Sequence, residues 1–145
     1  MTIAKMSMAE LEQFLHVEFR QAFSGGDIAI ESVDGQSCLL RQRYGDQMLR
    51  PGRTVSGPTL MALADLAMYV VLLSAIGPIG LAVTTNLNIN FLRKGQTGQD
   101  VLAAARLLKL GKRLAVGEVS LLSGTSPIAH ATSTYSIPNT QCISR

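Results

Sequence analysis

A long apolar stretch of this chain contains a single charged residue, which is acidic. From residue 54 to residue 92, Asp65 is the only Asp, Glu, Lys or Arg. The stretch includes TLMALADLAMYVV, which as a helix is apolar on nearly every side, and such a helix has to be buried. One Gly-Pro pair suits the start of this helix, and a second pair marks its end. We therefore expect a buried helix at residues 57–76 with a carboxylate inside it.

A membrane span is the alternative for this segment, because residues 59–76 are about long enough to cross a bilayer. Three features argue against a span. The acid lies inside the run, a Gly-Pro pair ends it, and the following segment alternates apolar and polar residues as the strands of a soluble protein do. We expect no membrane association.

The composition favours an oligomer. Of the 145 residues, 47% are hydrophobic and 16% are charged, which leaves few charges to cover the surface of a monomer. The net charge of +3, without Trp, does not predict a nucleic-acid surface. Two cysteines, Cys38 and Cys142, are too few for a disulfide framework, and the N-terminal residues lack the apolar core of a signal peptide. We expect reduced thiols in a cytoplasmic protein.

The other elements flank the central helix in one domain, residues 1–145. Apolar residues at helical spacing predict an N-terminal helix at 7–24, and its first residues, SMAE, have the spacing of a capping box. Residues 28–43 have the pattern of strand, turn and strand, or of one interrupted strand, and residues 81–137 that of a strand meander. We expect an α+β fold in which one curved antiparallel sheet wraps around the long helix.

Asp65 is the first candidate for chemistry. Burying a carboxylate without a partner costs several kcal/mol, so buried ionisable groups are biased toward functional sites. The structural alternative is an Asp that bonds a neighbouring backbone group or an arginine such as Arg50 or Arg53. The residue pattern alone favours neither interpretation.

The start of the same helix, at Ser56 and Gly57, is the second candidate. Its free N–H groups and the helix dipole can hold an oxyanion, although plain capping explains the same residues. Asp65 and Gly57 lie about 12 Å apart along one helix, whereas a carbonyl under attack needs its base and its oxyanion donor each about 3 Å away. Two antiparallel copies of the helix at a twofold axis would pair each acid with the other chain's glycine. We therefore predict a homodimer.

Four segments carry a family resemblance: SGPTLMALADLAM, LAVTTNLNINFLRKG, GQDVLAAARLLKLGKRLAVGEVSL and AHATSTYSIP. Together they resemble the hotdog-fold thioesterases of the PaaI type, over most of the chain from about residue 28 onward. The resemblance implies a hotdog fold, dimers or tetramers, and hydrolysis of acyl-CoA thioesters without a metal, with coenzyme A bound only as part of the substrate. It also implies that Asp65 acts as base or nucleophile on the thioester carbonyl, opposite the Gly57 N–H.

Three positions depart from the family pattern. The family usually has His-Gly-Gly at the helix start, where this chain has Ser-Gly-Pro at 56–58. An Asn or Gln commonly lies six residues before that motif, where this chain has Arg50, and a small hydroxyl residue often follows the acid by one turn, where it has Tyr69. Thr84 roughly matches a Ser or Thr that positions water in some members. We expect Arg50, Ser56, Tyr69 and Thr84 to line the substrate pocket.

Two pairs of basic residues, Arg93–Lys94 and Lys112–Arg113, fall at predicted turns. They are either partners for the phosphates of coenzyme A or ordinary solvated turn residues. The sequence has no nucleophile motif, phosphate loop or metal-ligand spacing.

We expect an acyl-CoA thioesterase. The first alternative is a module on the same fold that binds acyl thioesters without hydrolysing them, which the residues at 50, 56 and 58 favour. The second is a hotdog dehydratase or isomerase, which is disfavoured because no His is positioned to pair with the carboxylate. Four further residues either shape an acyl tunnel or pack the core: Met48, Leu49, Met61 and Leu72.

Overall fold

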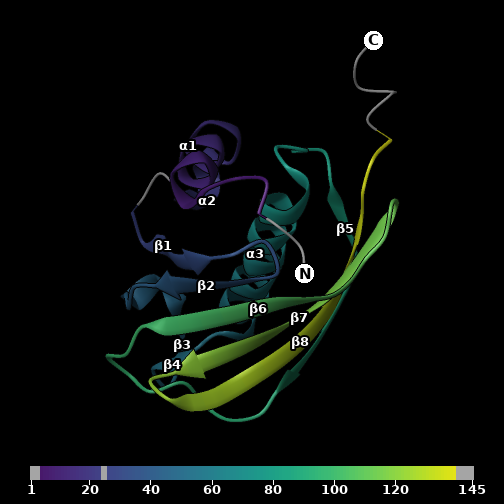
Figure 1. Ribbon diagram of the computed structural model, residues 1–145. Coiled ribbons are helices and arrows are strands. Elements are labelled where there is room, and N and C mark those ends of the chain that lie inside the picture. The colour runs from purple at the N-terminus through teal and green to yellow at the C-terminus, as the bar shows by residue number, and fades with distance from the viewer. Residues whose placement is uncertain (1–3, 24–25, 140–145) are drawn as a thin grey trace.

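The computed structural model describes residues 4–23 and 26–139, and a curved antiparallel sheet wraps around one long helix in it (Figure 1). The helices are α1 (Met8–Glu18), α2 (Arg20–Phe23) and α3 (Gly57–Ile76), with a short 3-10 helix, η1, at Asp46–Met48. The strands are β1 (Ile28–Val33), β2 (Ser37–Gln42), β3 (Leu49–Arg50), β4 (Thr54–Val55), β5 (Val83–Phe91), β6 (Val101–Leu110), β7 (Leu114–Ser123) and β8 (Ser126–Ser136). The expected α+β architecture is confirmed.

Helix α3 forms the centre of the core. It begins after Ser56, whose side-chain oxygen accepts a hydrogen bond from the Thr59 N–H at 3.2 Å. It ends before Gly77, whose φ of 97° lies in the left-handed region that favours glycine. The helix is long and apolar enough to cross a membrane, but 72% of its most apolar segment is buried inside the fold. Its apolar surface is therefore used by the core, against β2, β6 and β7.

The strands do not form one meander over residues 81–137. The strand order is β1-β2-β6-β7-β8-β5, and every neighbouring pair in this sheet is antiparallel. Strands β6, β7 and β8 follow one another across the sheet, whereas β5 pairs with β8 at the far edge. The connection differs because β5 follows α3, and α3 crosses the concave face and returns the chain to the edge beyond β8 (Figure 1).

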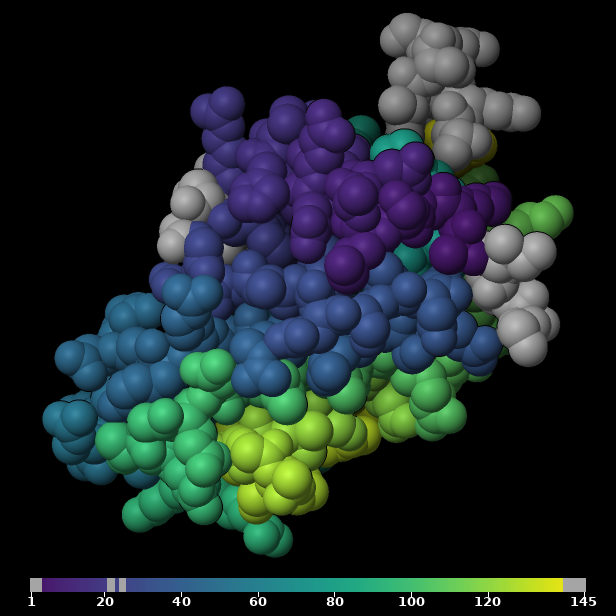
Figure 2. Space-filling model, turned by 60° about the vertical axis from the view of Figure 1, so that its left-hand side comes forward, coloured from purple at the N-terminus to yellow at the C-terminus, as the bar shows by residue number. Residues whose placement is uncertain are grey.

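The single N-terminal helix expected at 7–24 is interrupted. Helix α1 starts at the expected capping box, in which the Ser7 side chain accepts from the Glu10 N–H and the Glu10 carboxylate accepts from the Ser7 N–H. It stops at Phe19, which leaves helical geometry and packs its ring on Tyr69 of α3, with centroids 6.0 Å apart. Residues 24–25 lie outside the described part. Figure 2 shows this purple N-terminal segment lying along one side of the molecule beside the blue strands β1 and β2.

Cys38 is a buried free thiol on β2. Its S–H donates to the Ala67 carbonyl oxygen at 3.3 Å, and burial raises the pKa of the thiol to about 12. Such a thiol packs as a small apolar side chain. Cys142 lies outside the described residues.

Candidate active site

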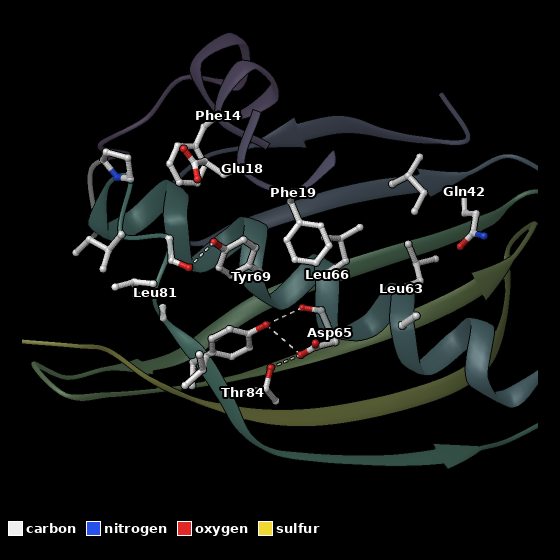
Figure 3. A pocket seen from close by; sticks show the side chains of 18 of the residues that line it. Phe14, Glu18, Phe19, Gln42, Leu63, Asp65, Leu66, Tyr69, Leu81 and Thr84 are labelled. Carbon is white, nitrogen blue, oxygen red and sulfur yellow. Dashed lines mark hydrogen bonds between the residues drawn. The ribbon is translucent and has the colours of Figure 1, made fainter. Parts of the chain in front are cut away.

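One face of α3 borders a pocket of about 1230 Å³ (Figure 3). The opposite walls come from α1, from the segment 78–84 that leads into β5, and from the edges of β1 and β2. The α3 residues that line the pocket recur at helical spacing: Thr59, Ala62, Leu63, Asp65, Leu66 and Tyr69. The face of α3 that the sheet leaves uncovered therefore carries the acid.

Asp65 is half-buried, and two hydroxyl groups hold one of its carboxylate oxygens. Its Oδ1 accepts a hydrogen bond from the Thr84 hydroxyl at 2.5 Å and another from the Tyr135 hydroxyl at 3.0 Å (Figure 3). None of the described residues donates a hydrogen bond to Oδ2 of the same carboxylate. The carboxylate is thus oriented through one oxygen, while the other is available to a ligand in the pocket.

Tyr135 is a site residue that the sequence does not reveal. It lies on β8, is 3% exposed, and pairs in register with Thr84 of β5. Burial, and to a smaller extent the charge of Asp65, raises the pKa of the Tyr135 phenol, so the hydroxyl remains a protonated donor. The alternating pattern of β8 places Tyr135 on the inner face of the sheet, but nothing in that pattern indicates which residue of α3 it meets.

Tyr69 and Thr84 both line the pocket with Asp65. The Tyr69 hydroxyl donates to the Gly80 carbonyl oxygen at 3.0 Å, so it fixes the segment before β5 and does not bind the acid. Burial first, and the negative charge of Glu18 second, raise the pKa of the Tyr69 phenol.

Ser56 and Gly57 lie at the start of α3 but do not line this pocket. The Ser56 hydroxyl is engaged by Thr59, with 2.7 Å between the two side-chain oxygens. The Gly57 N–H belongs to the first turn of α3, which has no acceptors within the helix. Gly57 also packs against Phe91, because a Cβ at Gly57 would lie 3.3 Å from Phe91 Cζ. Within one chain, the helix start and the acid are separate features.

Within one chain, the structure does not bring Arg50 to the pocket. This residue is exposed on β3, does not line the pocket, and forms no ion pair with Asp65, although the structure describes both residues. The two-stranded ribbon β3–β4 carries Arg50 ahead of the helix start, where its side chain faces solvent.

The four candidate basic residues are exposed and do not form one site within a chain. Arg93 and Lys94 follow β5 beside the β7–β8 turn, and the Arg93 guanidinium donates to the Ser126 hydroxyl at 3.5 Å. Lys112 and Arg113 occupy the β6–β7 turn. Because successive strands are antiparallel, these two turns lie at opposite ends of the sheet (Figure 1).

Of the two interpretations left open for Met48, Leu49, Met61 and Leu72, core packing holds for Met48 and Leu72. Met48 and Leu72 are core residues with 1% and 0% exposure, and neither they nor Leu49 and Met61 line the pocket. Their place is taken by Phe14, Glu18 and Phe19 from the N-terminal helices. The apolar face of α1 and the break at Phe19 turn these side chains toward α3.

No metal site accompanies the acid in the part of the chain that the structure describes. No group of three or more His, Cys, Asp or Glu side chains there lies close enough to hold a metal ion. The two histidines, His16 and His130, are both outside the pocket lining.

Solved structures share this fold along nearly the whole chain. A protein from Silicibacter sp. that is assigned as a thioesterase is 40% identical, with a TM-score of 0.87 and coverage of 95% of this chain and 96% of its own. The Escherichia coli PaaI protein of the phenylacetic acid degradation operon is 24% identical, with a TM-score of 0.72 and coverage of 88% and 95%. A hypothetical thioesterase of Streptococcus pneumoniae, solved with coenzyme A, is 21% identical, with a TM-score of 0.76 and coverage of 89% and 97%.

A family model agrees with these likenesses. No curated protein sequence matches the chain. The model of the Thioesterase superfamily matches residues 52–128, which contain α3, its acid and most of the sheet. The fold is the hotdog fold that the resemblance to PaaI-type thioesterases implies. The chain belongs to the Thioesterase superfamily.

Proposed function

We propose that this protein hydrolyses acyl-CoA thioesters to the free acid and coenzyme A. The observation that carries the proposal is the state of Asp65 in the pocket. A half-buried carboxylate with one oxygen held by two hydroxyls and the other facing a large pocket is suited to act on a bound carbonyl group. Family membership supports thioester hydrolysis as the reaction class.

The Asp65 carboxylate has two ways to open the thioester. As a general base, Oδ2 takes a proton from a water molecule that attacks the carbonyl carbon. As a nucleophile, Oδ2 attacks that carbon itself and forms an anhydride, which water then hydrolyses. In both cases the carbon–sulfur bond breaks, and the departing thiolate of coenzyme A takes up a proton. The hydroxyls of Thr84 and Tyr135 keep the carboxylate turned toward the pocket.

The negative oxygen that forms on the attacked carbonyl needs a hydrogen-bond donor. Gly57 of the same chain lies eight residues before Asp65, or about 12 Å along the helix, so its N–H cannot reach the same carbonyl. We infer that the donor is Gly57 of the partner subunit in a homodimer. The free N–H of that residue lies at the positive end of its helix, where an oxyanion is stabilised.

The free edge strand β5 supports this assembly. Thr84, near its start, bonds Asp65, and Phe91, at its end, packs on Gly57, so β5 and α3 run in opposite directions. Antiparallel pairing of β5 with its own copy, centred on Leu87, would place Thr84 opposite Asn90 of the partner subunit. Each acid would then face the helix start of the other chain. This edge also exposes apolar side chains, with Val83 at 56% and Phe91 at 52%.

The same twofold axis would bring basic residues of the two subunits close together. Within one chain, Arg93 lies at the opposite end of the sheet from Lys112 and Arg113. Antiparallel pairing of β5 would bring Arg93 of the partner subunit to the end where Val83 and the β6–β7 turn lie. By the same symmetry, Arg93 of one chain would be joined by Lys112 and Arg113 of the partner subunit at the other end of the sheet, where Gln42 lies. The cluster of cations at that end would suit the phosphates of coenzyme A.

A module that binds acyl thioesters without hydrolysing them is the second candidate. The engagement of Ser56 by Thr59 favours it, because the hydroxyl group next to the proposed Gly57 donor is already paired within its own helix start. A dehydratase or isomerase has no such support. His130 contacts Glu118 at 3.2 Å, and His16 lies on α1 with its ring near Phe23, so neither pairs with Asp65.

The test is thiol release from a panel of acyl-CoA thioesters by the wild type and by Asp65→Asn. We expect the variant to lose activity by about 100-fold or more, as for removal of a general base or nucleophile, while dimerisation and acyl-CoA binding persist. Glu12→Gln makes the same charge change on α1, away from the pocket, and should retain activity. Undiminished activity in Asp65→Asn would exclude the proposed role of the acid. A wild type that binds the thioesters and releases no thiol would be a binding module.

A further inference from the structure

Asp65 divides the pocket into two arms of different chemistry. Figure 3 shows Gln42 and Leu63 on one side of the acid, and Phe14, Glu18, Tyr69 and Leu81 on the other. The first arm, which we call the amide arm, has three polar residues: Gln42, Gln47 and Thr59. Thr59 precedes Leu63 by one turn of α3, and its hydroxyl donates to the carbonyl oxygen of Met48, the residue after Gln47. The second arm, which we call the acyl arm, is lined by Phe14, Glu18, Phe19, Leu66, Tyr69 and Leu81.

The two arms fit the two halves of an acyl-CoA molecule. Pantetheine carries two amide groups, which the side-chain amides and hydroxyl of the amide arm can satisfy by hydrogen bonds. The acyl arm presents three aromatic rings, of which Phe19 and Tyr69 lie 6.0 Å apart, and suits an apolar chain. With the thioester carbonyl at Asp65, the acyl group therefore extends toward Tyr69.

The only charges that line this pocket are negative. Its carboxylates are Glu18, Asp27 and Asp65, and none of the described lining residues is Lys, Arg or His. Glu18 belongs to the acyl arm. Burial raises the pKa of the Tyr69 phenol, and the negative charge of Glu18 adds to this shift. Arg20, two residues further on, is exposed and does not line the pocket.

We propose that the acyl arm accepts uncharged acyl groups and rejects those that end in a carboxylate, and that Glu18 is the residue that sets this selectivity. A second carboxylate in the arm would lose hydration and meet Glu18 and Asp65 with no cation to compensate. The inference rests on the proposed function, because it assigns the acyl group to a place beside Asp65. Glu18 lies outside residues 52–128, so this selectivity comes from the N-terminal helix rather than from the part that matches the family model.

Hexanoyl-CoA and adipoyl-CoA test the proposal, because they differ only in a terminal methyl or carboxylate group. Because Glu18 is exposed and its charge is screened by solvent, we expect a wild-type kcat/KM for hexanoyl-CoA that is about fivefold above that for adipoyl-CoA, the effect of one like-charge contact beside solvent. Glu18→Lys should shift this ratio toward adipoyl-CoA by about tenfold or more, through KM rather than kcat, because Glu18 does not touch the reacting atoms. The variant should fold, since Glu18 is the last residue of α1, where a cation suits the helix dipole.

Glu12→Lys is the matched control. It changes the net charge equally on the same helix but lies outside the pocket, so it should leave the ratio unchanged. Dissociation constants of both thioesters for Asp65→Asn report the same selectivity without catalysis. A wild type that treats the two thioesters alike or prefers adipoyl-CoA, or an equal shift in Glu12→Lys, would overturn the proposal. If no thioester of the panel is hydrolysed, the proposed function fails, while the two dissociation constants still decide the selectivity.

Discussion

Replacing Tyr135 with Phe removes one hydroxyl group and leaves the ring in place. Tyr135 is 3% exposed, and its ring stacks on Tyr69 with centroids 6.1 Å apart, so Phe preserves the packing. The loss is the 3.0 Å hydrogen bond to Asp65 Oδ1 and the 3.1 Å contact with the Asp65 carbonyl oxygen. The substitution therefore isolates the contribution of one of the two hydroxyls that hold the carboxylate.

The expected effect can be worked from these contacts. A hydrogen bond to a charged group contributes about 1.5–3 kcal/mol. Thr84 still holds the same oxygen at 2.5 Å, so we expect the lower part of this range. A loss of about 1.5–2 kcal/mol in the transition state corresponds to a decrease in kcat of roughly 10- to 30-fold. KM should change by less than about threefold, because the apolar lining of the pocket stays intact.

Steady-state thiol release, with any acyl-CoA that the wild type hydrolyses, measures both constants. Tyr44→Phe is a matched control, because the Tyr44 hydroxyl is buried without a hydrogen-bond partner among the described residues and lies outside the pocket. A wild-type kcat in Tyr135→Phe would refute the reasoning. An equal decrease in Tyr44→Phe would do the same, since it would point to a general loss of packing.

Four further predictions concern the second hydroxyl on Asp65, the buried thiol of Cys38 and a close contact between two strands. Thr84→Val removes the shorter bond to the same carboxylate oxygen, so kcat should fall further than in Tyr135→Phe, and kinetics of the double variant should be non-additive. The pKa of Cys38 is raised from 9.0 to about 12 in the folded state, so peptide mapping after iodoacetamide treatment at pH 8 should find it unlabelled until the protein unfolds. The folded thiol loses its proton at a higher pH than the unfolded thiol. The contribution of Cys38 to the free energy of unfolding is therefore present below pH 9.0 and is lost as the pH rises toward about 12. Urea unfolding at several pH values measures this loss. Gly117→Ala places a Cβ 2.9 Å from the Arg106 carbonyl oxygen and should lower the free energy of unfolding by about 1–3 kcal/mol, whereas an unchanged urea midpoint would show that the strands shift freely.

The central helix and its acid could be predicted because both depend on local signals. A Gly-Pro pair at each end and an unbroken apolar run define α3, and a single acid inside such a run is conspicuous. The capping box at Ser7 is equally local. Thr84 is predicted as a pocket residue only by the family resemblance. The register of β5 places its hydroxyl within hydrogen-bond distance of the Asp65 carboxylate.

The remainder of the site depends on contacts that sequence patterns do not encode. Tyr135 meets Asp65 across 70 residues of chain, and strand alternation gives its face but not its partner. Arg50 precedes the helix at the family's spacing, yet the β3–β4 ribbon turns it to solvent. The walls formed by Phe14 and Phe19 follow from the docking of α1 against α3 and β1, which an amphipathic pattern leaves open.

Mixing two inactive variants tests the shared site most directly. Gly57→Pro deletes the N–H of the proposed oxyanion donor, and Asp65→Asn removes the acid. The Phe91 ring must shift by a few tenths of an ångström to admit the new Cβ, so circular dichroism and the dimer mass first verify that Gly57→Pro folds. If each site combines Asp65 of one chain with Gly57 of the partner subunit, every mixed dimer regains one intact site, and random exchange in an equal mixture should restore about a quarter of wild-type activity. Native mass spectrometry of the mixture verifies that mixed dimers form. Mixed dimers that release no more thiol than the separate variants would contradict the account.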